Sequence, residues 1–514
     1  MSASAAFASP SPTFSAAPAT TPLVKAPDNT TLPMLGDSAR GDLSPVVERR
    51  LGEEIMNDIR RDPDYLDDDP ILEYLNNFGN ALVDAAPGAR GESNFNFGFF
   101  AVRDPMLNAF ALPGGFIAVH SALLIAAQNE SELASVMSHE IGHVEQRHIA
   151  RMLGQQRQDA LLPIAAMILA VLAAKASPDA AMGVIMGGQG LALQRQLSFS
   201  RDAEREADRV GFQIMRSAGY DTSGMVSFFK RLENSNKLYG ELPAFLSSHP
   251  LTGERIADIQ ARVREMPRKQ ARPDSIEFHL VRARARVLQD ESVKGRADAR
   301  AAFQAQLAQE NKQQQVAAQY GLAFLALREG ELDKAQGWLD KARVSMQPKP
   351  GVFSAEPDGT SGEAMFKGLG IEIKLAPGQP QNVLEQAAKD AAQAQQQFPL
   401  SRALARQYAS AMIAAGQNEE AARYLREQVR QYREEPKLYD LLAKAYSGQN
   451  KIALQHMALA ESYALTGALP AAVDQLHLAR KANDASFYDQ AVIDAREREI
   501  QQKQKDVKDD GKKK

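Results

Sequence analysis

The spacing of hydrophobic residues predicts two helices and a small sheet in the N-terminal part of the chain. Apolar residues at intervals of three and four indicate helices over residues 45–61, with Ser44 as a cap, and over residues 71–86. The interval then falls to two over residues 94–102, which predicts a strand. Residues 108–119 keep this interval on both sides of a Pro-Gly-Gly sequence, so we expect a strand, a turn and another strand.

Helical spacing returns over residues 129–153 and again over residues 200–219. Asn129 can cap the first of these helices, and Glu132, three positions later, can complete a capping box. A loop then leads to a further helix that starts near Gly253. Together these elements predict a mixed domain in which helices outnumber strands.

Beyond about Arg268 the chain is rich in alanine, glutamine and leucine, and its apolar spacing stays helical. At four places a glycine is followed five positions later by an alanine, with an apolar helix on each side. This pattern matches the helix-turn-helix of tetratricopeptide repeats, in which small residues stand where paired helices approach closely. Because the intervals between the glycines are irregular, a non-repetitive helical bundle is the alternative. The four pairs are Gly330 and Ala335, Gly416 and Ala421, Gly448 and Ala453, and Gly467 and Ala472.

The fold class that we predict is α+β, mostly α, with the chain divided into four parts. Residues 1–44 are rich in alanine, serine, threonine and proline, and we expect them to be disordered. Residues 45–267 form a mixed domain with a small β-sheet, and residues 268–498 form a helical domain of tetratricopeptide-like repeats. Residues 499–514 are a charged run, which predicts a solvated, disordered tail.

Composition narrows the classes of function. The chain of 514 residues has 60 basic and 64 acidic side chains, which gives a net charge of -4. This balance lacks the basic footprint of a duplex-binding protein, so we expect no nucleic-acid partner. The chain has no cysteine, which excludes disulfides and thiolate metal ligands. Any metal must therefore be held by histidine, aspartate or glutamate.

Two apolar features concern the cellular compartment. The run Ala160–Ala174 contains Pro163 and is shorter than the lower limit of about 17 residues for a membrane span. We expect it to be a buried helical hairpin, and membrane contact by residues 160–190 is the alternative. The N-terminal segment lacks a charged region followed by a continuous apolar run, so we predict no complete signal peptide.

The strongest chemical signal is the sequence HEIGH at residues 139–143, inside a predicted helix. His139 and His143 are four positions apart, so they project from one helix face and can bind one zinc ion. Glu140 lies at the edge of the same site and can act as a general base toward water. We therefore expect one zinc ion per chain.

Zinc needs a third protein ligand. The metzincin spacing fails here because Gln146 and Ile149 stand where that pattern has glycine and histidine. His148 is nine positions after His139, which predicts that it lies on the opposite helix face as a surface or second-layer residue.

The better third ligand is Glu204, on the helix predicted over residues 200–219. Asp208 lies one turn later on the same face and can accept the second ring N–H of a ligand histidine, which would fix the orientation of that ring. Glu206 points elsewhere on this helix.

Together these sequences resemble the HtpX and CAAX-prenyl-protease family of zinc metallopeptidases, which are gluzincins. The motifs that carry the resemblance are HEIGH, SRDAEREAD, NAFALPGG and SHP, and they cover about residues 45–265. The helical domain that follows makes the chain similar to the BepA branch, the beta-barrel assembly-enhancing proteases of the bacterial periplasm. The resemblance implies a gluzincin-type peptidase domain with His139, His143 and Glu204 as zinc ligands. It implies Glu140 as the catalytic base and Asp208 as the partner of a ligand histidine.

The resemblance also implies a function. It indicates a periplasmic zinc metalloendopeptidase that hydrolyses unfolded or misassembled proteins during outer-membrane protein assembly and quality control. The beta-barrel assembly machinery is then a candidate partner of the repeat domain. An extended substrate could pair with an exposed sheet edge. The residues predicted to form this edge are Gly115, Phe116, Ile117, Ala118 and Val119.

Two other functions remain open. One is a repeat-based periplasmic chaperone or adaptor whose peptidase site is mostly inhibited. The other is a membrane-bound prenyl protease, which the run Ala160–Ala174 suggests.

His249, in a Ser-His-Pro loop, matches an element at the active-site cleft of the similar branch. Its role has two readings. It closes the site at rest as a fourth zinc ligand, or it stabilises the transition-state oxyanion as a catalytic hydrogen-bond donor.

Overall fold

The computed structural model describes residues 43–154, 200–239, 245–246, 249–265, 272–347 and 361–512, except residues 87, 89 and 92. All of these residues belong to one contact unit, Gly36–Lys514. Nearly all of the segment 1–44, expected to be disordered, lies outside the described residues, as does the run Ala160–Ala174. Among the helices of the described part, none has both the length and the apolar character needed to cross a membrane.

A three-stranded sheet is central to the mixed region. Strand β3 (Phe116–His120) is the middle strand, parallel to β1 (Gly98–Val102) and antiparallel to β2 (Ala109–Leu112). The 3-10 turn η2 (Pro113–Gly115) joins β2 to β3, and Gly114 within it has a φ of 77°, which glycine adopts without strain. The strand–turn–strand predicted over residues 108–119 is therefore confirmed.

The position of β3 contradicts the expectation that Gly115–Val119 forms an exposed edge. Ile117 pairs with Phe99 of β1 on one side and with Ala111 of β2 on the other. An apolar pattern reports which faces of a strand are buried, but it does not report which strand is central. Among the described residues, β2 pairs only with β3. The side of β2 that faces away from β3 is therefore an unpaired edge of the sheet.

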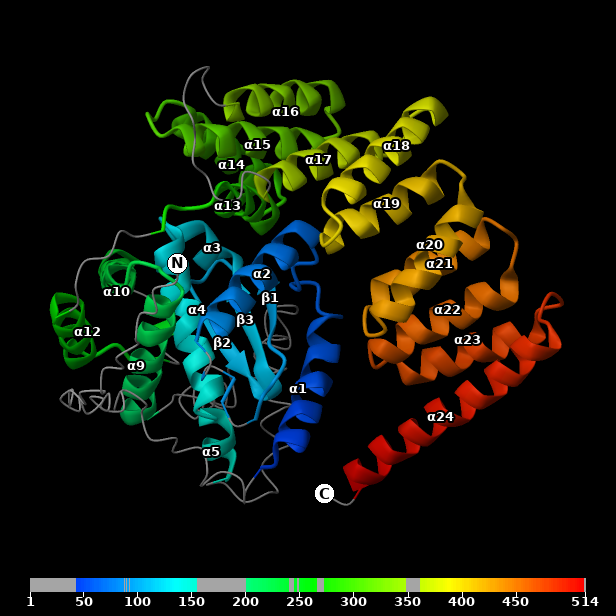
Figure 1. Ribbon diagram of the computed structural model, residues 1–514, viewed down its shortest axis with the longest axis horizontal. Helices are drawn as coiled ribbons and strands as arrows, with labels where there is room; N and C mark the ends of the chain where they lie inside the picture. The colour runs from blue at the N-terminus through cyan, green and yellow to red at the C-terminus, as the bar shows by residue number, and fades with distance from the viewer. Residues whose placement is uncertain are drawn as a thin grey trace, which may run out of the picture. The chain divides into compact units, whose positions relative to one another are not determined.

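Helix α1 (Pro45–Ile59) lies beside the sheet (Figure 1). Ile55 and Ile59 of this helix share a core with Phe100 and Phe116 of the strands. The predicted cap is confirmed, because Ser44 Oγ accepts from the backbone N of Val47. These contacts attach the N-terminal helix to the sheet.

Helix α2 (Asp69–Ala85) packs against β1, where a Cβ at Gly79 would lie 2.4 Å from the Phe99 ring. Helix α4 (Glu130–Glu145) contacts α2 and also lies along β2. The other helices of this region are α3 (Ser121–Ala126), α5 (His148–Gly154), α9 (Arg201–Ser217), α10 (Ser223–Tyr239) and α12 (Gly253–Glu265).

The single helix predicted over residues 129–153 is two helices, α4 and α5. Between them, Arg147 takes a φ of 52°, in the left-handed region. Its buried guanidinium lies 3.0 Å from the Glu48 carboxylate of α1 and also donates to the Leu43 carbonyl oxygen. Helical spacing in the sequence cannot reveal this break, because a tertiary ion pair stabilises it.

The C-terminal half is helical throughout its described part (Figure 1). Consecutive helices pack against one another, as the predicted helix-turn-helix pattern requires. The helices are α13 (Ile276–Gln289), α14 (Val293–Leu307), α15 (Lys312–Arg328), α16 (Leu332–Met346), α17 (Ser361–Lys374), α18 (Gln381–Gln397), α19 (Arg402–Ala414), α20 (Asn418–Gln431), α21 (Pro436–Ser447), α22 (Ile452–Leu465), α23 (Leu469–Lys481) and α24 (Phe487–Lys512).

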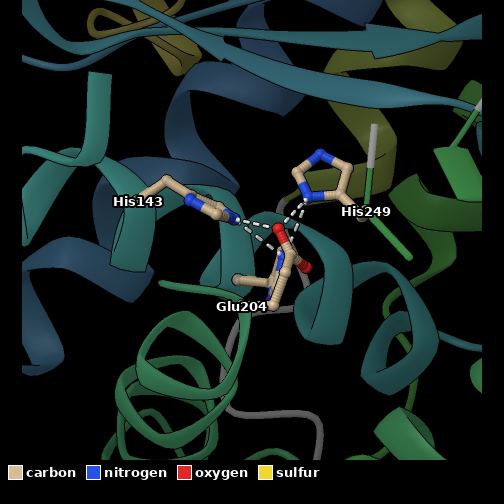
Figure 2. Close-up of side chains that lie close together, drawn as sticks. His143, Glu204 and His249 are labelled. Carbon is tan, nitrogen blue, oxygen red and sulfur yellow. Dashed lines mark hydrogen bonds and ion pairs between the residues drawn. The ribbon is translucent and has the colours of Figure 1, made fainter. Parts of the chain in front are cut away.

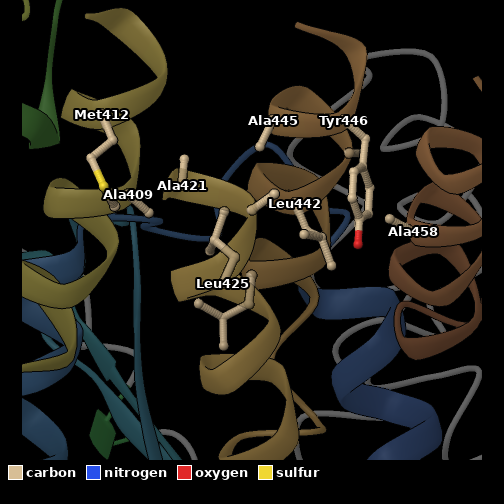
Figure 3. Close-up of a cluster of buried hydrophobic side chains, with 11 residues drawn as sticks. Ala409, Met412, Ala421, Leu425, Leu442, Ala445, Tyr446 and Ala458 are labelled. Carbon is tan, nitrogen blue, oxygen red and sulfur yellow. The ribbon is translucent and has the colours of Figure 1, made fainter. Parts of the chain in front are cut away.

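The glycine and alanine pairs lie at helix turns, as predicted. Gly330, Gly416 and Gly467 take φ values of 73° to 79° between helices, whereas at the Gly448 turn Asn450 adopts the left-handed conformation, with a φ of 57°. The alanine that follows each glycine is at most 1% exposed. Figure 3 shows one resulting core, in which Leu425 and Leu442 contact small residues of neighbouring helices.

The tail is a correction. Helix α24 continues to Lys512, whereas the charged run at residues 499–514 predicts disorder. Glutamate, glutamine, arginine and lysine are all good helix formers, and Arg496 pairs with Glu499 one turn later. Charge alone therefore did not distinguish an exposed helix from a disordered tail.

An acidic segment at the start of α2 attaches the helical repeats to the mixed region. Arg284 of α13 is buried and donates to Asp68 at 2.6 Å and to Glu372 at 3.2 Å. Asp69 pairs with Arg406 of α19 at 2.9 Å. In the sequence this acidic segment is only a break between two helices, but in the structure it joins the mixed region to the helical repeats.

We expect Arg284→Ala to lower the free energy of unfolding by about 3–5 kcal/mol, because it leaves Asp68 and Glu372 without their buried cation. Urea unfolding of the full chain followed by circular dichroism measures this. Arg286→Ala, on the same helix, is the control, because Arg286 has no ion pair among the described residues. Equal effects of the two substitutions would show that the junction does not depend on the Arg284 pairs.

Candidate metal centre

Helix α4 directs two histidines toward one point. Asn129 Oδ1 accepts from the Glu132 amide at 2.9 Å, as predicted, while the Glu132 carboxylate accepts from the Gln128 amide rather than from that of Asn129. His139 and His143 follow one turn apart. Both are buried, and their Nε2 atoms lie 3.0 Å apart.

Helix α9 approaches α4 closely enough to bring a carboxylate to these rings. A Cβ at Gly142 would lie 3.0 Å from the Ala207 carbonyl oxygen, and one at Gly211 would lie 2.9 Å from the His139 backbone N. Only glycine permits this separation of the two backbones. As a result, oxygens of the Glu204 carboxylate lie 3.4 Å from the Nε2 atoms of both rings.

His249 completes a group of four donors. Its Nδ1 lies 3.0 Å from Glu204 Oε1 and 3.3 Å from His139 Nε2. The ligand atoms of His139, His143, Glu204 and His249 all lie within 4.8 Å of one another. Figure 2 shows His143, Glu204 and His249 pointing toward a common position.

This group fits a tetrahedral zinc ion. Zinc bound to nitrogen and oxygen at about 2.0–2.2 Å holds its donor atoms about 3.3–3.6 Å apart. Five of the separations here run from 3.0 to 3.4 Å, and all four ligand atoms lie within 4.8 Å of one another. Burial disfavours a charged His139, yet Asp208 and Glu204 raise the pKa of this ring to about 10. The site therefore favours positive charge at this position, as a cation site requires.

Asp208 and an arginine surround the donors. Asp208 Oδ1 lies 3.0 Å from His139 Nδ1, the contact that the sequence predicts. Arg255, 2% exposed, binds Asp208 through two nitrogens at 2.6 and 2.8 Å and lies 2.8 Å from Glu204. We did not predict Arg255 from the sequence. The sequence offers only one indication of its role, a basic residue at the start of the helix that follows the Ser-His-Pro loop.

His148 is not on the opposite face from His139, because the break at Arg147 redirects the chain. Its Nδ1 lies 2.8 Å from His143 Nδ1, and its Nε2 lies 2.9 Å from Glu206 Oε2. Burial would raise the pKa of Glu206, but hydrogen bonds from His148 and Arg151 lower it to about 2.

Glu140 is fully buried beside the donors, with Oε1 3.5 Å from His249 Nε2. Among the described residues, neither of its carboxylate oxygens has a hydrogen-bond partner of normal geometry. Burial raises the pKa of Glu140, and the nearby His249 and His139 partly offset this. A buried carboxylate with increased proton affinity beside such a group of donors has the properties of a general base.

Comparisons with known proteins agree with this geometry. The sequence profile of Peptidase family M48 matches residues 74–263. The chain is 32% identical over 478 residues to the beta-barrel assembly-enhancing protease of Escherichia coli strain K12, covering 93% of each chain. It is 31% identical over 466 residues to the protein of that name from Yersinia pestis, covering 90% of each. Human mitochondrial metalloendopeptidase OMA1 is 27% identical over 211 residues, 40% of this chain and 38% of that one.

We expect His139→Ala to lose most of its bound zinc, because the remaining donors cannot enclose the ion. Metal analysis by mass spectrometry on purified full-length protein measures the zinc-to-protein ratio. His477→Ala, an exposed histidine of α23, is the control and should keep one zinc per chain. Full occupancy in the His139 variant would contradict the donor set.

Proposed function

The chain belongs to peptidase family M48 and is a zinc-dependent metalloendopeptidase, and on this premise we propose which residues act and on which proteins. The observation that carries the proposal is a buried carboxylate with a raised pKa, Glu140, next to a four-donor metal centre. We propose His139, His143 and Glu204 as the zinc ligands and Glu140 as the general base.

Zinc at this centre supplies polarisation of the scissile carbonyl and a lowered pKa for water. Glu140 accepts the proton of the attacking water and delivers it to the leaving amine, and its raised pKa suits both transfers. Asp208 holds the His139 ring through Nδ1, and the single charge of Arg255 partly offsets the two carboxylates of Asp208 and Glu204.

We propose that His249 keeps the site closed at rest. Its Nδ1 is near enough to Glu204 and His139 to serve as the fourth donor, and the Phe245 ring stacks on it at 4.6 Å. Each of the four donor residues is at most 2% exposed, so a peptide reaches their side chains only after a rearrangement. A loop residue such as His249 can move more easily than residues on α4 and α9.

The edge of β2 replaces β3 as the proposed substrate strand. The His120 amide donates to the Asn108 carbonyl at 3.0 Å, so in the alternating pattern of antiparallel strands Ala109 and Ala111 direct their backbone groups away from β3. The Ala111 amide also stabilises the charged form of Glu140, which indicates that this edge faces the site. An extended substrate would form backbone hydrogen bonds there.

We propose unfolded or misassembled proteins as substrates, with recognition by the repeats. The relatives that cover 93% of this chain are named for beta-barrel assembly, which suggests outer-membrane protein precursors and contact with the assembly machinery in the periplasm. A cavity of about 520 Å³ between α16, α17 and α18 supports a recognition role. Its walls combine apolar Phe366 and Ile371 with charged Arg343, Lys367 and Asp390, a mixture suited to polypeptide.

The buried donors also favour a second function. A chain whose site stays closed by His249 would act mainly as a repeat-based chaperone or adaptor. The two functions differ in whether opening the site is part of the normal cycle.

We expect Glu140→Gln to keep its fold and zinc but to cleave an unfolded protein about 10²–10⁴-fold more slowly, because the amide cannot accept the proton. The variant should retain substrates, and mass spectrometry of co-purified proteins tests whether these are outer-membrane precursors. Glu145→Gln on the same helix is the control. Near-normal cleavage by Glu140→Gln would remove this residue as the base.

We expect His249→Ala to cleave unfolded protein faster than the unchanged chain and to cleave itself, because the fourth donor position is vacated. Gel-based cleavage rates and zinc content measure this. A rate that falls by about 100-fold with zinc retained would indicate an oxyanion donor instead. An unchanged rate would eliminate both roles.

A further inference from the structure

The ring of His143 is held by another histidine. His148 Nδ1 lies 2.8 Å from His143 Nδ1, and the two rings meet at a centroid distance of 4.9 Å and an angle of 73°. On its other side, His148 Nε2 lies 2.9 Å from Glu206 Oε2. Arg151 donates to the same carboxylate oxygen at 2.8 Å. His148 is 3% exposed, so it is a buried link between His143 and an ion pair.

The chemistry of imidazole assigns a direction to this chain of contacts. Two ring nitrogens that share one hydrogen bond must include one donor and one acceptor. A neutral histidine that offers Nε2 to zinc carries its proton on Nδ1, so His143 donates and His148 accepts. His148 then carries its own proton on Nε2, where the Glu206 carboxylate can only accept.

The two histidines of α4 are therefore oriented differently. The Nδ1 of His139 meets a carboxylate directly, at 3.0 Å from Asp208. Among the described residues, the Nδ1 of His143 meets the His148 ring, which in turn meets a carboxylate. Helix α9 supplies both carboxylates, from Glu206 and Asp208, which follow Glu204 by two and four positions.

This arrangement depends on the break between α4 and α5. In a continuous helix His148, nine positions after His139, would be rotated from it by about half a turn and would lie on the opposite face. Arg147, at a φ of 52° between α4 and α5, is bound by Glu48, and α5 begins at His148, in contact with the His143 ring.

We propose that His148 is a positioning residue that selects the Nδ1–H form and the ring orientation of His143, with Glu206 fixing His148 in turn. This inference rests on the proposed role of His143 as a zinc ligand. The proposal predicts that loss of the His148 ring weakens zinc binding, which can be measured without any assay of proteolysis.

The test compares two substitutions in the full chain. His148→Phe keeps a ring in the buried space but has no acceptor. His148→Asn offers a carbonyl oxygen near the former Nδ1 position, although it does not reach Glu206. Competition with a chromophoric chelator measures the zinc dissociation constant, and the absorption spectrum of the cobalt-loaded protein reports ligand geometry. We expect His148→Phe to weaken zinc binding by about 10–100-fold and to alter the cobalt spectrum, and His148→Asn to restore most of both.

The controls separate this proposal from the proposed ligands. His477 pairs with Glu497 at 3.0 Å on the repeats, so His477→Phe removes a similar pair without touching the centre and should leave the zinc constant unchanged. If His148→Phe binds zinc normally while His139→Ala does not, the positioning role of His148 is wrong, whereas the proposed ligand set is retained. If His139→Ala also binds zinc normally, the ligand set itself is wrong.

Folding is checked by circular dichroism. Two folded variants, Phe and Asn, with equally weak zinc binding would show that the missing acceptor is not the cause, and would overturn the proposal. If His148→Phe does not fold, the comparison moves to Glu206. There Glu206→Gln keeps an acceptor oxygen for His148 and Glu206→Ala removes it, so we expect weaker zinc binding only in the alanine variant. Equal binding by these two would also overturn the proposal.

Discussion

The close approach of α4 and α9 is the contact on which the metal centre depends. Two glycines, Gly142 and Gly211, allow the backbones to lie where any Cβ would collide with the opposite helix. That separation determines whether the Glu204 carboxylate reaches the two rings of α4. A Cβ at either glycine would press against the backbone of the opposite helix at 2.9–3.0 Å, so the two helices, and with them the donors, would have to shift.

Charge balance is the second requirement. Glu140, Glu204 and Asp208 are all buried at the centre, and isolated buried carboxylates are costly. Arg255 compensates two of them directly, and a bound cation would compensate the group as a whole. Glu140 remains without a cation of its own, which preserves its capacity to take a proton.

Helix α4 is anchored at both ends by other parts of the chain. At its start, Asp274 accepts from the Glu130 amide, while the Glu130 carboxylate accepts from Ser275 at the first turn of α13. At its end, Arg147 binds Glu48 of α1. The helix that carries the metal donors is therefore tied both to the N-terminal helix and to α13, the first described helix of the C-terminal half.

Much of this protein follows from local sequence. The HEIGH spacing places two histidines on one helix face, Asp208 follows Glu204 by one turn, and the glycine–alanine pairs mark the repeat turns, because helical periodicity alone relates these positions. The tertiary structure alone decided that β3 is central, that the chain breaks between α4 and α5 at Arg147 and that Arg255 joins the centre. Each of these depends on a partner far away in the chain: a second strand, the Glu48 carboxylate or the carboxylates of α9. Periodicity reports which face of an element is buried, but it carries no information about which distant residue will meet that face.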